Sequence, residues 1–346
     1  MQRLLRGKLL YVCLGALVVS LYWRALPGRP SLPAESAPLP APASQELAWW
    51  PKEVSVSMVQ RAVQERPRAA ALLVFLSTVL SGLFAGGLIM TGWALLTGRA
   101  RNIRRFPSAG VSRWTFSELV RIVLLTAIVA GLLPFVHLAV LAARPGGTLN
   151  PHLWISGSML ILDLFLGLTI VAFASGGSGA RRTFFPSAAW PRAITVGLQS
   201  YLAAFPWLFL SLIVIVETAH RFGFRPPVEP IQELIFNESH PGVLALTVVL
   251  ACFVGPLTEE LFFRGVLYGA LRHRVSQAAA ILISAALFSL IHTNVLGFIP
   301  IMLLGCLLAY VYERTGSLAS SLAIHILHNS LLMGLALSFR RLFPSG

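Results

Sequence analysis

Apolar runs of membrane-spanning length recur from residue 70 almost to the end of this 346-residue chain. A transmembrane helix needs about 20 consecutive apolar residues, whereas the strands of a membrane barrel are about half as long. The runs therefore predict an all-α protein, a polytopic bundle of about 8–9 transmembrane helices once an N-terminal run is counted. The runs are 70–96, 119–142, 153–174, 193–217, 243–271, 277–293, 296–312 and 317–338.

The composition agrees with a membrane protein. Hydrophobic residues make up 56% of the chain and charged residues 12%, against about 25% charged residues in soluble domains. The net charge of +14 is almost all arginine, and the arginines gather at the ends of the apolar runs. That distribution is typical of proteins in a lipid bilayer, so we expect no nucleic-acid partner. Cys13, Cys252 and Cys306 all lie in apolar runs and match no disulfide or zinc pattern.

The arginines also predict an orientation. The loops 97–115 and 176–192 and the segment after residue 271 are arginine-rich, and all three fall on the side of the basic N-terminus if each run spans. Positive loops are cytoplasmic, so the N-terminus is expected in the cytoplasm. Arg340 and Arg341 then fall on the opposite side. An arginine-rich, lysine-poor chain suggests a GC-rich bacterial genome, so we predict a bacterial inner membrane protein.

The N-terminal part predicts an anchor followed by a linker. A basic start precedes the apolar run 9–23, and Tyr22-Trp23-Arg24 resembles an interfacial belt, which favours a signal anchor over a cleaved signal peptide. A Pro/Ala-rich stretch with no core of its own follows, with a short amphipathic helix expected within 45–68. The predicted divisions are 1–26 (signal anchor or first transmembrane helix), 27–68 (linker), 69–190 (accessory transmembrane helices) and 191–340 (core).

Three charged residues interrupt the apolar run that ends in 253-FVGPLTEELFFRGVLYG-269. A charge at the bilayer centre costs about 2.5–3.5 kcal/mol on insertion scales, so such residues indicate function. Glu260 and Arg264 are four residues apart on one helix face and are predicted to form an ion pair. Glu259 is rotated by about 100° and must face something else. The preceding Gly255-Pro256 predicts a kink or a break in this helix.

Polar pairs at helical spacing occur on two later runs. Phe288 and His292 share one face, as do His325 and Asn329, while His328 points aside. Three helices could thus present a carboxylate, an imidazole, and an imidazole with an amide towards one interior point. A carboxylate there can act as a base on water, and imidazole and amide groups can donate to an oxyanion.

The remaining intramembrane ionisable residues are isolated. His137 and Asp163 are interpreted as single buried groups, each holding two helices together by hydrogen bonds. A purely structural interpretation also covers Glu260, Arg264 and the histidines, as an ion pair with hydrogen-bonded imidazoles. It leaves Glu259 unexplained, because a second buried carboxylate adds desolvation and repulsion.

The three polar elements resemble the motifs of the CPBP family of intramembrane proteases. This family includes the CAAX prenyl protease type 2 enzymes and the bacterial Abi and bacteriocin-processing homologues. The matching elements are EExxxR at 259–264, FxxxH at 288–292 and HxxxN at 325–329, in the family's order and each on its own apolar run. The resemblance covers about residues 190–340, and the N-terminal half carries no family signature.

The resemblance implies an intramembrane endopeptidase that hydrolyses a peptide bond near the C-terminus or the membrane anchor of its substrate. It implies that Glu259 activates the hydrolytic water and that His292 holds or polarises this water. His325 and Asn329 would stabilise the oxyanion. The partners implied are the lipid bilayer and a peptide or protein substrate, which in some members is lipid-modified.

Glu260 and Arg264 are implied to support the site, and Phe288 to pack against it. The HExxH helix of common zinc proteases is absent, so we expect no tightly bound metal. If zinc is bound, its ligands would be Glu259, His292 and His325.

The depth of these residues agrees with chemistry inside the bilayer. Glu259 lies about 20 Å from Arg272, and His325 about 12 Å from Ser317, at 1.5 Å per helical residue. Two other functions fit the same residues. One is a non-catalytic membrane scaffold or immunity protein of the same fold, and the other is a proton- or ion-coupled transporter.

Overall fold

The computed structural model describes residues 16, 55–97, 114–143, 150–175, 190–224, 230–292 and 294–343, which form helices and no strands. Seven helices in these ranges are long and apolar enough to cross a membrane. The all-α, polytopic architecture is therefore confirmed, and the chain is an integral membrane protein. The predicted anchor lies outside the described residues except for Ala16, so the total of 8–9 spans and the division into domains stay predictions.

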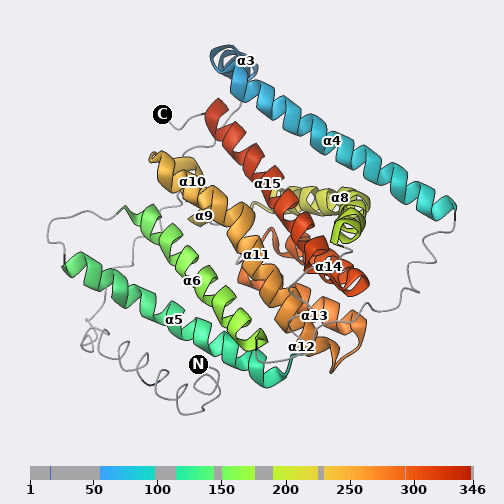
Figure 1. The fold of residues 1–346 in the computed structure, drawn as a ribbon. Helices are drawn as coiled ribbons and strands as arrows, with labels where there is room; N and C mark the ends of the chain where they lie inside the picture. The colour runs from blue at the N-terminus through green and yellow to red at the C-terminus, as the bar shows by residue number, and fades with distance from the viewer. Residues whose placement is uncertain are drawn as a thin grey trace.

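The spanning helices pack side by side, with α4 along α8 and α15, and with the end of α15 near α3 (Figure 1). In chain order the helices are α3 (Val56–Glu65), α4 (Pro67–Leu96), α5 (Phe116–Ala142), α6 (Pro151–Ala174), α8 (Trp190–Arg221), α9 (Pro230–Asn237), α10 (Pro241–Val249), η2 (Leu250–Val254), α11 (Gly255–Glu260), η3 (Leu261–Tyr268), α12 (Gly269–Arg272), α13 (Gln277–Ile291), α14 (Phe298–Thr315) and α15 (Leu318–Leu342).

The ends of several helices follow from capping residues in the sequence. Thr115 and Glu118 form a capping box at the start of α5, each side chain accepting from the backbone N–H of the other. The Asn150 side chain caps α6 in the same role. Gly316, with a φ of 62°, ends α14, and the Ser317 side chain then caps α15. These caps fix the points at which the chain leaves each span.

Helix α13 is shorter than the hydrocarbon core of the bilayer. The predicted span 277–293 is a helix of 15 residues, about 22 Å long against a hydrocarbon core of about 30 Å. At one end of the hairpin that α13 forms with α14, Arg272 Nε lies 3.0 Å from Glu313 Oε1, and at the other His292 Nε2 lies 3.9 Å from Glu259 Oε2. The end of α13 therefore lies at the level of Glu259, between the two ends of the spanning helix Pro241–Arg272.

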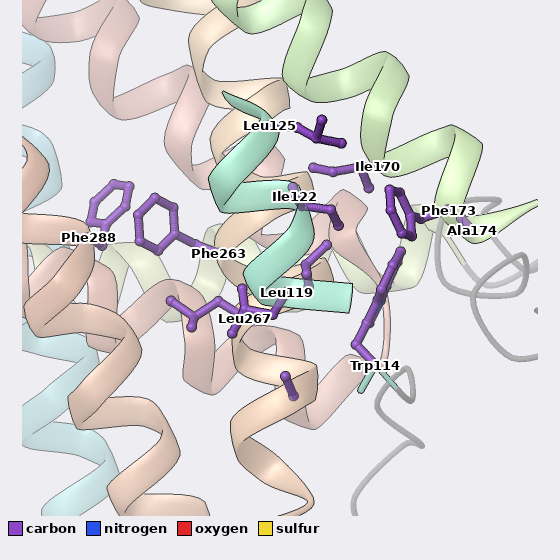
Figure 2. Packing of buried hydrophobic residues seen from close by; sticks show 12 residues of the cluster. Trp114, Leu119, Ile122, Leu125, Ile170, Phe173, Ala174, Phe263, Leu267 and Phe288 are labelled. Atoms are coloured by element: carbon purple, nitrogen blue, oxygen red, sulfur yellow. The ribbon is translucent and has the colours of Figure 1, made fainter. Parts of the chain in front are cut away.

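A cluster of buried apolar side chains joins α5 and α6 to the helix that carries the paired glutamates (Figure 2). Ile122 of α5, Ile170 of α6 and Val266 of η3 are fully buried in it. The Phe263 ring meets Phe288 of α13 edge-on, with centroids 5.1 Å apart. Two of the helices in the predicted accessory region, α5 and α6, thus pack directly against this helix.

A cluster of buried polar side chains joins α6, α10 and α15. It lies near the start of α6 and the end of α15. The Glu238 carboxylate accepts from the His240 backbone N–H at 2.6 Å, and lies 2.8 Å from His152 Nδ1 and 3.2 Å from Asn150 Nδ2. Arg340 donates to the Glu238 carbonyl. Burial alone would raise the pKa of Glu238, but the bonds from His240, His152 and Asn150 outweigh it and lower that pKa.

Replacing Glu238 by glutamine should lower the unfolding temperature at neutral pH, because about 2 kcal/mol of charge-assisted hydrogen bonding is lost. A carboxyl whose folded-state pKa is lowered stabilises the fold above its unfolded value, and this contribution disappears as the pH falls. The difference in unfolding temperature between the wild type and the variant should therefore become smaller below pH 4.5, the ordinary pKa of a glutamate side chain. Thermal unfolding in detergent from pH 7 to pH 3 measures it. A gap independent of pH would contradict the prediction.

Candidate active site

One continuous helix, Pro241–Arg272, carries the paired glutamates. The sequence predicts a kink or a break at Gly255-Pro256, but the structure instead changes the hydrogen-bond register of an unbroken helix. The Gly255 N–H donates to the Leu250 carbonyl five residues back, in the π-helical segment η2, and a second π-helical segment, η3, follows α11. A widened turn accommodates a proline without a break, and such turns are frequent at functional sites.

Glu260 is the centre of a buried ionic network. Its Oε1 lies 2.9 Å from Arg264 Nη1 and 3.0 Å from His325 Nδ1. The three side chains are at most 2% exposed. Arg264 Nη2 also donates to the Gly305 carbonyl on α14 at 3.4 Å. The ion pair that the spacing predicts is therefore present, and protein encloses it.

Glu259 has different surroundings, although it is the adjacent residue. Its side chain is 27% exposed, and its Oε2 lies 3.6 Å from His325 Nε2 and 3.9 Å from His292 Nε2. This oxygen is buried and has no hydrogen-bond partner in the described part of the chain. Glu260 is thus fixed by its partners, while Glu259 offers an unused acceptor to the space between the two histidines.

Both imidazole rings are oriented through their Nδ1 atoms. His292 Nδ1 lies 2.7 Å from the Phe288 carbonyl, an acceptor only, so Nδ1 carries the proton and donates. His325 Nδ1 lies 3.0 Å from Glu260 Oε1, which Arg264 keeps ionised, and donates in the same way. The Nε2 atoms of both rings therefore face Glu259.

Phe288 packs as the motif implies, at the centre of the polar cluster. Its ring is 1% exposed, and the Arg264 guanidinium carbon lies 4.5 Å from the ring centroid. The ring also lies 4.7 Å from the His292 ring and 5.6 Å from the His325 ring. A cation over an aromatic face is attracted by it, so Phe288 both separates and stabilises these charged groups.

Asn329 lies one turn beyond His325 on α15 and contacts the same neighbouring helix. Its Nδ2 donates to the Ala251 carbonyl in η2 at 2.8 Å. His328 points aside, as the spacing predicts, and its Nδ1 lies 3.0 Å from the Tyr201 hydroxyl of α8. The structure thus brings Glu259, Glu260, His292 and His325 together and places Asn329 one turn from His325, while the catalytic roles of these residues stay predictions.

Asp163 lies beside this cluster, although the sequence suggests an isolated residue. The hydroxyl of Thr258, the residue before Glu259, donates to Asp163 Oδ1 at 2.9 Å. A Cβ at Gly167, one turn after Asp163, would lie 3.5 Å from the Thr258 methyl group. The spacing of Asp163 and Gly167 shows a shared face, but no local pattern tells which helix that face meets.

His137 belongs to a different place. Its ring stacks on Trp154, with centroids 4.4 Å apart and an interplanar angle of 14°, so it joins α5 to α6 away from Glu259.

A metal ion does not fit these side chains as they are arranged. No group of three or more His, Cys, Asp or Glu side chains in the described ranges has the geometry to hold one. This includes Glu259, His292 and His325. The chemistry below therefore uses only protein groups and water, and the expectation of no tightly bound metal stays a prediction.

Residues 241–331 match the family described as "Type II CAAX prenyl endopeptidase Rce1-like". This range contains every residue of the three motifs. Similar curated proteins include YdiL of Bacillus subtilis (strain 168), whose name proposes a membrane peptidase, with 27% identity over 88 residues. The UPF0177 protein YxdF of Lactococcus lactis subsp. lactis (strain IL1403) is 31% identical over 84 residues, and an uncharacterized 24.3 kDa protein of Escherichia coli is 27% identical over 145 residues. No solved structure matches the chain.

The aligned parts cover 25%, 24% and 40% of this chain, and 36%, 45% and 66% of the three relatives. The chain thus spans between about a third and two-thirds of the length of these relatives. Residues 241–331 are similar to the Rce1-like family, and this confirms the resemblance to the CPBP proteases for this part of the chain.

Proposed function

We propose that this protein is an intramembrane endopeptidase in which Glu259 activates a water molecule. The observation that carries the proposal is the contrast between the two adjacent glutamates. One oxygen of each carboxylate lacks a hydrogen-bond partner in the described part of the chain, but Glu260 is 1% exposed and paired with Arg264, whereas Glu259 is 27% exposed and its Oε2 forms no ion pair with a described arginine or lysine. That oxygen faces two imidazole Nε2 atoms at 3.6 and 3.9 Å, an arrangement suited to hold water beside a base.

In the proposed reaction, the water lies between Glu259 and His292. His292 Nε2 accepts one hydrogen bond from the water and orients it, because Nδ1 is held by the Phe288 carbonyl. Glu259 takes a proton as the water oxygen attacks the carbonyl carbon of the substrate. The peptide C–N bond then breaks, and the same proton passes from Glu259 to the leaving amine.

The oxyanion formed in this attack is stabilised by His325 and Asn329. His325 already donates from Nδ1 to Glu260, so it can donate from Nε2 only when both ring nitrogens are protonated. Asn329 has two amide hydrogens, and the bond to Ala251 uses one of them. The other remains for the oxyanion.

The substrate is a membrane-anchored peptide or protein, cut near its C-terminus or its anchor. The family description names prenylated CAAX substrates, which makes a lipid-modified peptide the first to test. The three relatives are bacterial, which supports the bacterial inner membrane, and the arginine-rich loops support a cytoplasmic N-terminus.

The protein purified in detergent should cleave one of a panel of membrane-anchored peptides, including a farnesylated CAAX peptide. Glu259→Ala and His292→Ala should each lower the rate by about 100-fold or more. His137→Ala is the matched control, because this histidine stacks on Trp154 away from Glu259, and it should leave the rate unchanged. A strong chelator should not slow the wild type, since water is activated by the carboxylate.

Two outcomes would change the proposal. Loss of cleavage with the chelator, restored by zinc, would replace the carboxylate mechanism by a metal-dependent one. If no peptide is cut, the membrane proteins of cells with the wild type and with Glu259→Ala should be compared. No difference between the two would favour the scaffold or the transporter.

A further inference from the structure

The carbonyl of Ala251, in η2, lacks both of the backbone donors that a helix could give it. In an α-helical register its donor would be the Gly255 N–H, but that group donates to Leu250 instead. In the π-helical register, five residues apart, its donor would be residue 256, and proline has no N–H. The register change and the proline together leave this carbonyl without a partner in its own helix.

The side chain of Asn329 supplies the missing donor. Its Nδ2 lies 2.8 Å from the Ala251 oxygen, a normal hydrogen-bond length. In a membrane interior an unpaired backbone carbonyl is costly, because no water replaces the lost bond. The amide therefore stands in for the backbone N–H that Pro256 lacks.

We propose that Asn329 is a positioning residue that fixes the helix bearing Glu259 against the helix bearing His325. α15 then holds the Pro241–Arg272 helix at two points, through His325 on Glu260 and through Asn329 on Ala251. These points are one turn apart on α15 and nine residues apart on the Pro241–Arg272 helix. The second point, Ala251, lies in the widened turn η2, four residues before Gly255. The Glu259 side chain lies next to that turn, since its Oε1 would be 3.8 Å from a Cβ at Gly255.

This inference deepens the proposed function and rests on it, since Asn329 acts on the reaction through the place of Glu259. It gives the two amide hydrogens of Asn329 separate tasks, one on Ala251 and one on the oxyanion. Loss of the first task can be repaired by giving residue 256 an N–H. Loss of the second cannot.

The test is a double-mutant cycle of four proteins: wild type, Asn329→Leu, Pro256→Ala and the double variant. Leucine has nearly the shape of asparagine but no donor, and alanine at 256 restores an N–H in register with the Ala251 carbonyl. Unfolding temperature in detergent is measured for all four, together with kcat and KM for the peptide that the wild type cleaves.

Asn329→Leu should lower the unfolding temperature by about 3 °C or more and kcat by about ten-fold or more, with KM little changed. Pro256→Ala alone should change both quantities little. In the double variant at least half of the decrease in unfolding temperature should be reversed. The recovery of kcat should be only partial, because the oxyanion donor is still absent. If Asn329→Leu does not fold alone, recovery of folding in the double variant supports the inference equally.

The inference is overturned if Pro256→Ala restores neither the unfolding temperature nor kcat of Asn329→Leu. A fall in kcat with no change in unfolding temperature would leave Asn329 as an oxyanion donor only. The unfolding temperatures need no substrate. They therefore test the role of Asn329 even if the protein proves not to be a protease.

Discussion

Glu259→Gln will hydrolyse the substrate about 100- to 10,000-fold more slowly than the wild type, and it will unfold at the same temperature or a higher one. The amide that replaces the carboxylate has nearly the same size and still contacts the two histidines. It cannot take a proton from water, so the attack loses its base. The rate is measured with the peptide that the wild type cleaves, and unfolding in the same detergent.

The predicted unfolding temperature of Glu259→Gln follows from the lack of a hydrogen-bond partner for the Glu259 carboxylate in the part of the chain that the structure describes. Its Oε2 is buried and has no hydrogen-bond partner in the described ranges, and no arginine or lysine neutralises it there. A buried charge without a partner costs free energy, so a neutral amide removes a cost. Replacing a catalytic residue often stabilises a protein, because activity can require a group that lowers the stability of the fold.

Glu260→Gln is the matched control, since it makes the same chemical change one residue along the same helix. Here the unfolding temperature should fall, because Arg264 and His325 lose the negative charge that both contact. An unfolding temperature that falls equally in both variants would contradict the division of roles. So would a Glu259→Gln protein that keeps the activity of the wild type.

The parts of this site that the sequence predicts are those set by local geometry. Glu260 and Arg264 are paired because residues four apart on a helix are neighbours. The same rule places Glu259 on another face, and sets His328 apart from His325 and Asn329. The apolar runs likewise give the helices because their length matches the bilayer.

The parts that the sequence does not predict depend on contacts between distant segments. Asp163 meets Thr258 only because α6 packs against α11, and no spacing within either helix encodes that contact. The register change around Gly255-Pro256 keeps the helix continuous where proline alone suggests a kink. We infer that this register change is stabilised by the hydrogen bond from Asn329 to Ala251, two residues that are 78 positions apart in the chain. The apolar run 277–293 likewise predicts a full span, whereas α13 ends at Ile291.

The charges in this membrane segment are tolerated for two different reasons. Glu260 and Arg264 neutralise each other within protein, and Phe288 and the Gly305 carbonyl cover the guanidinium. Glu259 borders the short α13–α14 turn, and non-helical backbone at this depth occurs where it is buried in protein or lines a polar cavity. The full free-energy cost of placing a charge in lipid therefore applies neither to the Glu260–Arg264 pair nor to Glu259. The first reason gives the second large prediction.

Arg264→Met should destabilise the protein by about 3–5 kcal/mol, because it leaves the Glu260 carboxylate buried without its cation. The matched control is Arg221→Met. Glu217 and Arg221 have the same four-residue spacing and a similar distance of 2.8 Å, but their side chains are 54% and 74% exposed. An exposed pair contributes at most about 1 kcal/mol, so this variant should unfold almost as the wild type does.

Replacing both members of the buried pair tests the cause of the loss. In Glu260→Leu with Arg264→Met no charge is left unpaired, so much of the stability lost in Arg264→Met should return. The measurement is denaturant unfolding in detergent of five proteins: the wild type, Arg264→Met, Glu260→Leu, the double variant and Arg221→Met. If the double variant is as unstable as the sum of its single changes, the arginine contributes through packing on Phe288 and not through its charge. Equal losses in Arg264→Met and Arg221→Met would show that enclosure by the protein gives the pair no special weight.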